Sequence, residues 1–172
     1  MGAADAAGLG GVTSGGSTAR PDRRFDDATA LVAAVAAGEL SPVEAMERAL
    51  ARMEEVNPAL NAVVHPRAER ALEEARGLSD APAAGFAGRH RPLAGVPIAV
   101  KDLGCEQAGE PHHRGSRLLA EAGRREHEDS HLYGLLAGAG AVSLGRTNTP
   151  EFGTTITTEP AVYGPTANPW SL

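Results

Sequence analysis

Two short apolar runs, each ending in polar residues, constrain the fold of this chain more than any other feature. Val96 to Val100 has the length and β-branched content of a buried strand, and Lys101 follows it directly. The second run, "AVSLG", leads into the polar tripeptide Arg146-Thr147-Asn148. A segment with helical spacing separates the two runs. This alternation predicts an α/β fold with mostly parallel strands.

A capping box predicts where the longest helix begins. In "SPVE", Ser41 takes the N-cap position, Pro42 the first helical position and Glu44 the third. Asn57-Pro58 is expected to end this helix, because the residue before a proline disfavours helical geometry.

Three further helices are expected from signals at their ends. "LNAVV" is another short strand candidate, and residues 104–127 are expected to be loop with only weak periodicity. The helix signals are Asp27 with Gly38, Pro66 in a first turn with Gly77 at the end, and Asp129 or Ser130 as the start of the last helix.

Charge and cysteine content exclude several classes of protein. The net charge is −6 and arginines alternate with acids, so no basic stripe for nucleic acid is present. The single cysteine, Cys105, excludes an internal disulfide framework and fits a reducing, cytoplasmic compartment. No apolar run approaches the ~20 residues that span a bilayer. Residues 1–24 resemble neither a signal peptide nor a phosphate loop and are expected to form a flexible leader.

The stretch "HEDSH" matches a zinc-binding pattern with His127 and His131 as ligands and Glu128 as the base. A zinc metallopeptidase is therefore one alternative function. The context disfavours it, because Asp129 and Ser130 are helix-start residues and His127 would precede the helix. His112, His113 and Cys105 are expected to be loop residues and an inert thiol rather than ligands or a nucleophile.

Lys101 is the sharpest candidate for chemistry. A lysine at a strand end commonly extends its charge into water along an apolar surface. If it is desolvated instead, burial disfavours the charged form and the amine can act as a general base. Ends of parallel strands are where α/β folds place active sites, so Lys101 and Asn148 are expected to face one crevice.

Several motifs in order resemble the amidase signature family. They are "PLAGVPIAVKDLG", "GSRLLA", "LLAGAGAVSLGRTNTPEFG" and "TTEPAVYGPTANPW", and the opening helices are similar as well. The resemblance covers residues 25–172. It implies the N-terminal portion of the amidase signature fold, a mixed, mostly parallel sheet covered by helices. The details slightly favour the branch with cyclic amide hydrolases over the branch that amidates tRNA-bound glutamate.

The resemblance also implies a mechanism. A Ser–cis-Ser–Lys triad hydrolyses the carbon–nitrogen bond of a small-molecule amide, without cofactor or metal, and the base of that triad corresponds to Lys101. Asn148 would position substrate or cap the turn before Pro150. Asp102 would orient Lys101 or cap a turn.

The chain departs from the family pattern at its end. It stops at Leu172, before the Gly/Ser-rich signature that supplies both serines, and neither Ser116 nor Ser171 corresponds to them. We therefore expect a fragment that carries only the lysine, is inactive alone and tends to aggregate. A non-catalytic interaction module is the alternative from another class. A homodimer of the full-length protein is left open.

Overall fold

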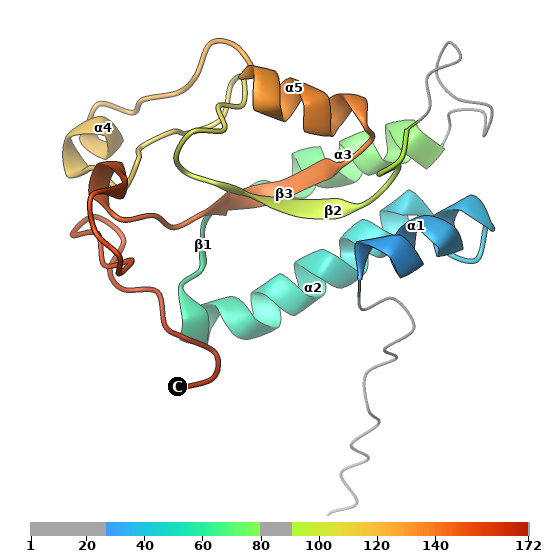
Figure 1. Cartoon of the computed structure of the whole chain (residues 1–172), viewed down its shortest axis with the longest axis horizontal. Coiled ribbons are helices and arrows are strands. Elements are labelled where there is room, and N and C mark those ends of the chain that lie inside the picture. The colour runs from blue at the N-terminus through green and yellow to red at the C-terminus, as the bar shows by residue number, and fades with distance from the viewer. Residues whose placement is uncertain (1–26, 80–90, 172) are drawn as a thin grey trace, which may run out of the picture.

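The computed structural model describes residues 27–79 and 91–171. The predicted leader at 1–24 lies outside the described residues. The elements in chain order are α1 (Ala28–Ala36), α2 (Pro42–Leu60), β1 (Val63–Pro66), α3 (Ala68–Ser79), β2 (Pro97–Lys101), α4 (Arg117–Glu121), α5 (His131–Gly138), β3 (Val142–Thr147) and the 3-10 turn η3 (Glu151–Gly153) (Figure 1).

The strands form a mixed sheet in the order β1-β3-β2. β2 pairs parallel with the central strand β3, and Lys101 lies opposite Thr147. β1 pairs antiparallel with β3, and His65 lies opposite Arg146. The predicted α/β class with a mixed sheet is confirmed. The antiparallel pair follows from the order of connections, because β1 is not joined to β3 by a single helical crossover.

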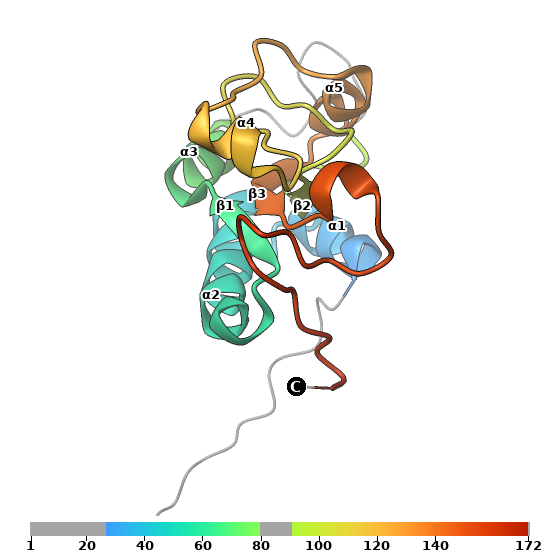
Figure 2. The ribbon, with the colours of Figure 1, turned by 90° about the vertical axis from the view of Figure 1, so that its left-hand side faces the viewer.

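Helices cover both faces of this sheet. Met46 and Leu50 of α2 share one apolar cluster with α3 and with Val142 and Leu144 of β3. On the other side, Tyr133 of α5 packs with Val100 of β2 in a second cluster. Figures 1 and 2 show α5 and α2 on opposite sides of the strands. The strand ends therefore emerge from a layered core.

Local capping chemistry sets the helix starts as predicted. Asp27 accepts a hydrogen bond from the amide of Ala30 at 2.8 Å. Ser41 and Glu44 form the complete capping box at the start of α2. Ser130 caps α5, so His131 is the first helical residue there. These bonds satisfy amides that have no partner within their helix.

The prediction that α2 ends at Asn57-Pro58 is wrong. The helix continues through Pro58 to Leu60 and ends at Asn61, whose φ of 51° is left-handed. In the last turn a proline removes only one helical hydrogen bond. The side chain of Asn57 offsets that loss, because its Oδ1 accepts bonds from the amides of Ala62 and Val63.

Three other boundaries differ from the predictions. Pro66 closes strand β1 rather than lying in the first turn of α3, and α3 runs through Gly77 to Ser79. Residues 104–127 contain the short helix α4, which weak periodicity did not reveal. Among residues 27–79 and 91–171, no helix is both long and apolar enough to cross a membrane.

Candidate active site

Lys101 is the last residue of β2, at the edge of the sheet where the parallel strands β2 and β3 end together. Asn148 follows the last residue of β3, Thr147, which lies opposite Lys101. The sheet thus brings the two predicted site residues to one edge. This is the edge at which α/β folds collect functional side chains.

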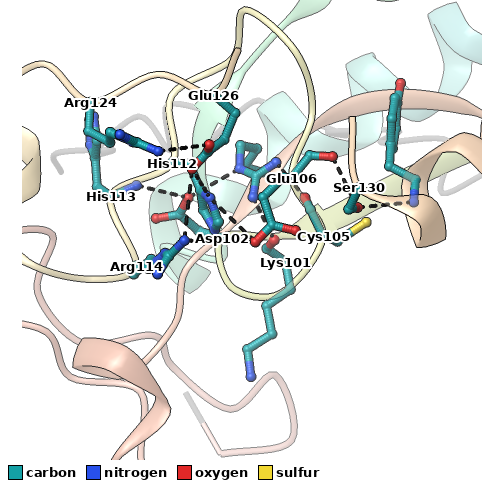
Figure 3. A network of polar contacts seen from close by, with 12 residues as sticks. Lys101, Asp102, Cys105, Glu106, His112, His113, Arg114, Arg124, Glu126 and Ser130 are labelled. Atoms are coloured by element: carbon teal, nitrogen blue, oxygen red, sulfur yellow. Dashed lines mark hydrogen bonds and ion pairs between the residues drawn. The ribbon is translucent and has the colours of Figure 1, made fainter. Parts of the chain in front are cut away.

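The side chain of Lys101 is exposed, and Figure 3 shows it pointing away from the polar network at the end of β2. The prediction that Lys101 is desolvated is therefore wrong for the part of the chain that the structure describes. Strand alternation explains the exposure. The neighbouring side chains of Val100 and Asp102 are buried, whereas that of Lys101 points out from the opposite face.

Composition carries a signal about Lys101 that its motif alone does not. The chain has sixteen cationic lysine and arginine residues, of which fifteen are arginines and only Lys101 is a lysine. Arginine stays protonated in proteins, whereas a lysine can give up its proton. The one position that differs from the arginine habit of this chain is the strand end where a base is expected.

Asp102 does not contact the amine of Lys101. Its carboxylate is 1% exposed, and Oδ1 accepts hydrogen bonds from Nε of Arg146 at 3.1 Å and from the amide of His113 at 3.2 Å. Arg146, also 1% exposed, donates further bonds to the carbonyls of Lys101 and Cys105, each at 3.0 Å. Sequence reasoning missed this pair, because 44 residues separate its members.

A second buried polar pair lies in the loop above the strand ends (Figure 3). His112 is fully buried, and its Nδ1 lies 2.7 Å from Oε1 of Glu126. Burial alone would raise the pKa of Glu126, but hydrogen bonds from His112 and Arg124 outweigh it and lower that pKa. The pair ties two arms of the loop together, so the predicted loop residue His112 has a structural role.

Two histidines and a tyrosine meet beside the same edge. The hydroxyl of Tyr163 contacts Nε2 of His65 at 3.1 Å and also Nδ1 of His113. Burial lowers the pKa of His65 to about 4, lowers that of His113, and raises that of Tyr163 to about 12. The three rings are therefore uncharged at neutral pH. They join β1 and the 111–116 loop to the C-terminal segment.

Asn148 is buried and uses its whole side chain within the protein. Its Nδ2 donates to the carbonyl of Gly164 and to Oγ1 of Thr166, both at 3.0 Å, and its Oδ1 accepts from the amide of Thr149. In the described part of the chain, Asn148 thus holds the 164–166 segment. Its role toward substrate stays a prediction.

The zinc pattern does not assemble on one helix face. Because α5 begins at His131, the exposed His127 lies before the helix, as its start signals predict. Within the ranges 27–79 and 91–171, no three His, Cys, Asp or Glu side chains are grouped so that they could hold a metal ion. Cys105 is a buried free thiol whose pKa is raised, chiefly by burial. A raised pKa disfavours the reactive thiolate.

Comparison with known sequences extends over most of the chain. The family model described as Amidase matches residues 44–172. The 6-aminohexanoate-cyclic-dimer hydrolase of Paenarthrobacter ureafaciens is 38% identical over 148 residues, which are 86% of this chain and 28% of that protein. A glutamyl-tRNA(Gln) amidotransferase of Alkalilimnicola ehrlichii is 42% identical over 142 residues, covering 83% of this chain and 28% of that protein.

Solved structures give the same result. A 6-aminohexanoate cyclic dimer hydrolase complexed with substrate superposes with a TM-score of 0.75 and 38% identity, covering 85% of this chain and 28% of that chain. The native peptide amidase of Stenotrophomonas maltophilia gives 0.73 and 32%, covering 87% of this chain and 31% of that chain. The chain therefore spans about 28% of the length of the curated relatives it matches. With the family model and both kinds of relative in agreement, the chain belongs to the Amidase family, the amidase signature enzymes.

Proposed function

We propose that this chain is the lysine-bearing part of an enzyme that hydrolyses carbon–nitrogen amide bonds, with Lys101 as the general base of a Ser–cis-Ser–Lys triad. The observation that carries the proposal is the placement of the only lysine of the chain at the carboxyl end of β2, beside the parallel strand β3. An amine there can accept a proton, which an arginine cannot.

The exposure of Lys101 bears on where the rest of the site is found. The described residues leave its amine in solvent, and neither Ser116 nor Ser171 lies in a motif that corresponds to a serine of the triad. In our proposal the two serines, and the groups that remove water from Lys101, belong to the remainder of the amidase fold. The chain by itself is therefore expected to be inactive.

The proposal is limited to amide bonds as a class. The relatives include both a cyclic-dimer hydrolase and an amidotransferase, and the chain matches about the same 28% of each. Small amides are the first substrates to test. The buried free thiol of Cys105 supports a reducing compartment such as the cytoplasm.

The test is amide turnover by the whole protein, meaning this chain together with the remainder of the amidase fold. Lys101→Met removes the amine and keeps most of the side-chain length. We expect kcat to fall by at least about 100-fold, because general base catalysis contributes roughly 10²–10⁴-fold. Arg70→Met, which removes a more distant cation, is the control and should keep its turnover. Undiminished turnover of Lys101→Met would remove the base assignment.

A further inference from the structure

We propose that Arg146 is the positioning residue for Lys101: its buried guanidinium holds the main chain at the root of the lysine side chain. The inference rests on the proposed function of Lys101 and adds a residue to it. Figure 3 shows the side chain of Lys101 extending away from the polar network that its own main chain joins.

The contacts of Arg146 all reach one short turn. Nη2 donates to the carbonyl of Lys101, Nη1 to the carbonyl of Cys105, and Nε to the carboxylate of Asp102. The two carbonyls and the carboxylate are separate acceptors, and a planar guanidinium with five N–H donors can serve all three. An ammonium at the same place is a point charge without this fork.

The turn has few other anchors. Gly104 adopts a φ of 73°, and Leu103 is only half-buried. The amide of Asp102 donates to the carbonyl of Thr147 at 3.1 Å, which is the last sheet-like bond at this end. The hydrogen bonds from Arg146 therefore continue the hold of the sheet on the chain beyond β2.

Positioning matters because lysine is a long side chain. Fixing the carbonyl of Lys101 fixes its peptide plane and hence the direction in which the side chain leaves the strand. A general base must lie within about 2.6–3.2 Å of the group whose proton it takes. A change in direction at the Cα of Lys101 is magnified along the methylenes of the side chain, so the amine would miss that position.

The main variant is Arg146→Lys, which keeps a positive charge beside Asp102 but cannot serve both carbonyls. The matched control is Arg67→Lys. Arg67 is also buried, and it also pairs with carboxylates and donates to a carbonyl, that of Ser143, but it does not contact the turn after β2. Backbone amide hydrogen exchange measured by NMR on the 172-residue chain gives the readout.

We expect exchange of the Asp102 amide to become about tenfold faster or more in Arg146→Lys and to stay unchanged in Arg67→Lys. In the whole protein, Arg146→Lys should lower kcat and leave KM unchanged, because substrate contacts are retained. Unchanged exchange at Asp102 in Arg146→Lys, or an equal acceleration in Arg67→Lys, would overturn the proposal.

A second variant removes the ion pair without leaving a buried charge. In Asp102→Asn/Arg146→Gln, Lys101 remains the only lysine, so selective ¹³C labelling of lysine reports on its side chain alone. We expect greater mobility of its β-methylene than in the wild type. Wild-type mobility would contradict the proposal, as would unfolding of both Arg146 variants while Arg67→Lys stays folded. None of these measurements needs turnover, so they are separate from the test of Lys101 as a base.

Discussion

At the residue scale, the end of β2 shows how one step along a strand separates two environments. Lys101 is exposed, whereas the next side chain, that of Asp102, is 1% exposed and paired with Arg146. The alternation of a strand requires this contrast. It allows a charged amine to stand beside a buried ion pair without forming part of it.

The histidines near this edge predict a dependence of stability on pH. Burial lowers the pKa of His65 from 6.5 to about 4 in the folded chain, so the unfolded chain binds more protons between these values. Stability is therefore fully present above about pH 6.5 and is lost as the pH falls toward 4. The expected result is a melting temperature that decreases over this window.

The variant His65→Gln keeps a hydrogen-bonding side chain near Tyr163 but cannot titrate. Its melting temperature should fall less between pH 6.5 and 4 than that of the wild type. The exposed His131, which is replaced by Gln as a control, should leave the wild-type slope in place. A slope that does not change in His65→Gln would show that burial of His65 is not its cause.

Asn148 predicts a second effect at this scale. Asn148→Ala removes the donors to Gly164 and Thr166 and leaves the Thr149 amide without its acceptor. We expect the free energy of unfolding to fall by about 1–3 kcal/mol, measured by urea denaturation. The exposed Asn168→Ala is the control. If Asn148→Ala keeps wild-type stability yet abolishes turnover, Asn148 acts on substrate rather than on the 164–166 segment.

At the element scale, helix starts are the features that local sequence predicts best. The capping bonds of Asp27, Ser41 and Ser130 join residues three apart, so the sequence nearby contains all the information. The end of α2 depends on the side chain of Asn57 folding back onto β1, which no local rule includes. The helix therefore passes through a proline that the sequence alone presents as a stop signal.

The capping box provides a prediction for α2. Ser41→Ala removes the acceptor for the Glu44 amide, at 3.1 Å, and should lower the free energy of unfolding by about 1 kcal/mol. Glu44→Gln keeps the reciprocal bond to the Ser41 amide and should have a smaller effect. Urea denaturation measures both. Equal losses in the two variants would indicate that charge at the start of α2, not the serine acceptor, stabilises the helix.

The parts of the site that sequence reasoning missed are contacts between elements. Lys101 and Asn148 were found because each follows an apolar run. Arg146 was noted only as a polar residue at a strand end, and its partner Asp102 only as a neighbour of Lys101. Their pairing needs β2 and β3 to lie side by side, which depends on the whole sheet.

At the scale of the whole molecule, large apolar side chains lie on the surface. Ile156 and Trp170 are almost fully exposed, and Phe152 is half exposed. Since exposed apolar surface favours association, we expect the 172-residue chain to self-associate as its concentration rises. Light scattering should give a mass above the 17.6 kDa of the chain.

The double variant Ile156→Ser/Trp170→Ser should associate less, and Thr157→Ser in the same segment should behave as the wild type. A monomer at all concentrations would instead favour the alternative of a stable, non-catalytic interaction module. The resemblance of the motifs identified the family correctly, because several of them occur in order over most of the chain. The exposure of Lys101 could not be deduced in this way, because it depends on what packs around the strand end.

The central claim is that Lys101 works by giving up a proton, and Lys101→Arg tests it most directly. Arginine keeps the positive charge and a similar length but does not release its proton at the pH of catalysis. Amide turnover by the whole protein carrying Lys101→Arg should therefore fall by at least about 100-fold, as in Lys101→Met. Turnover close to that of the wild type in Lys101→Arg would mean that only a positive charge is needed there, and would contradict the account.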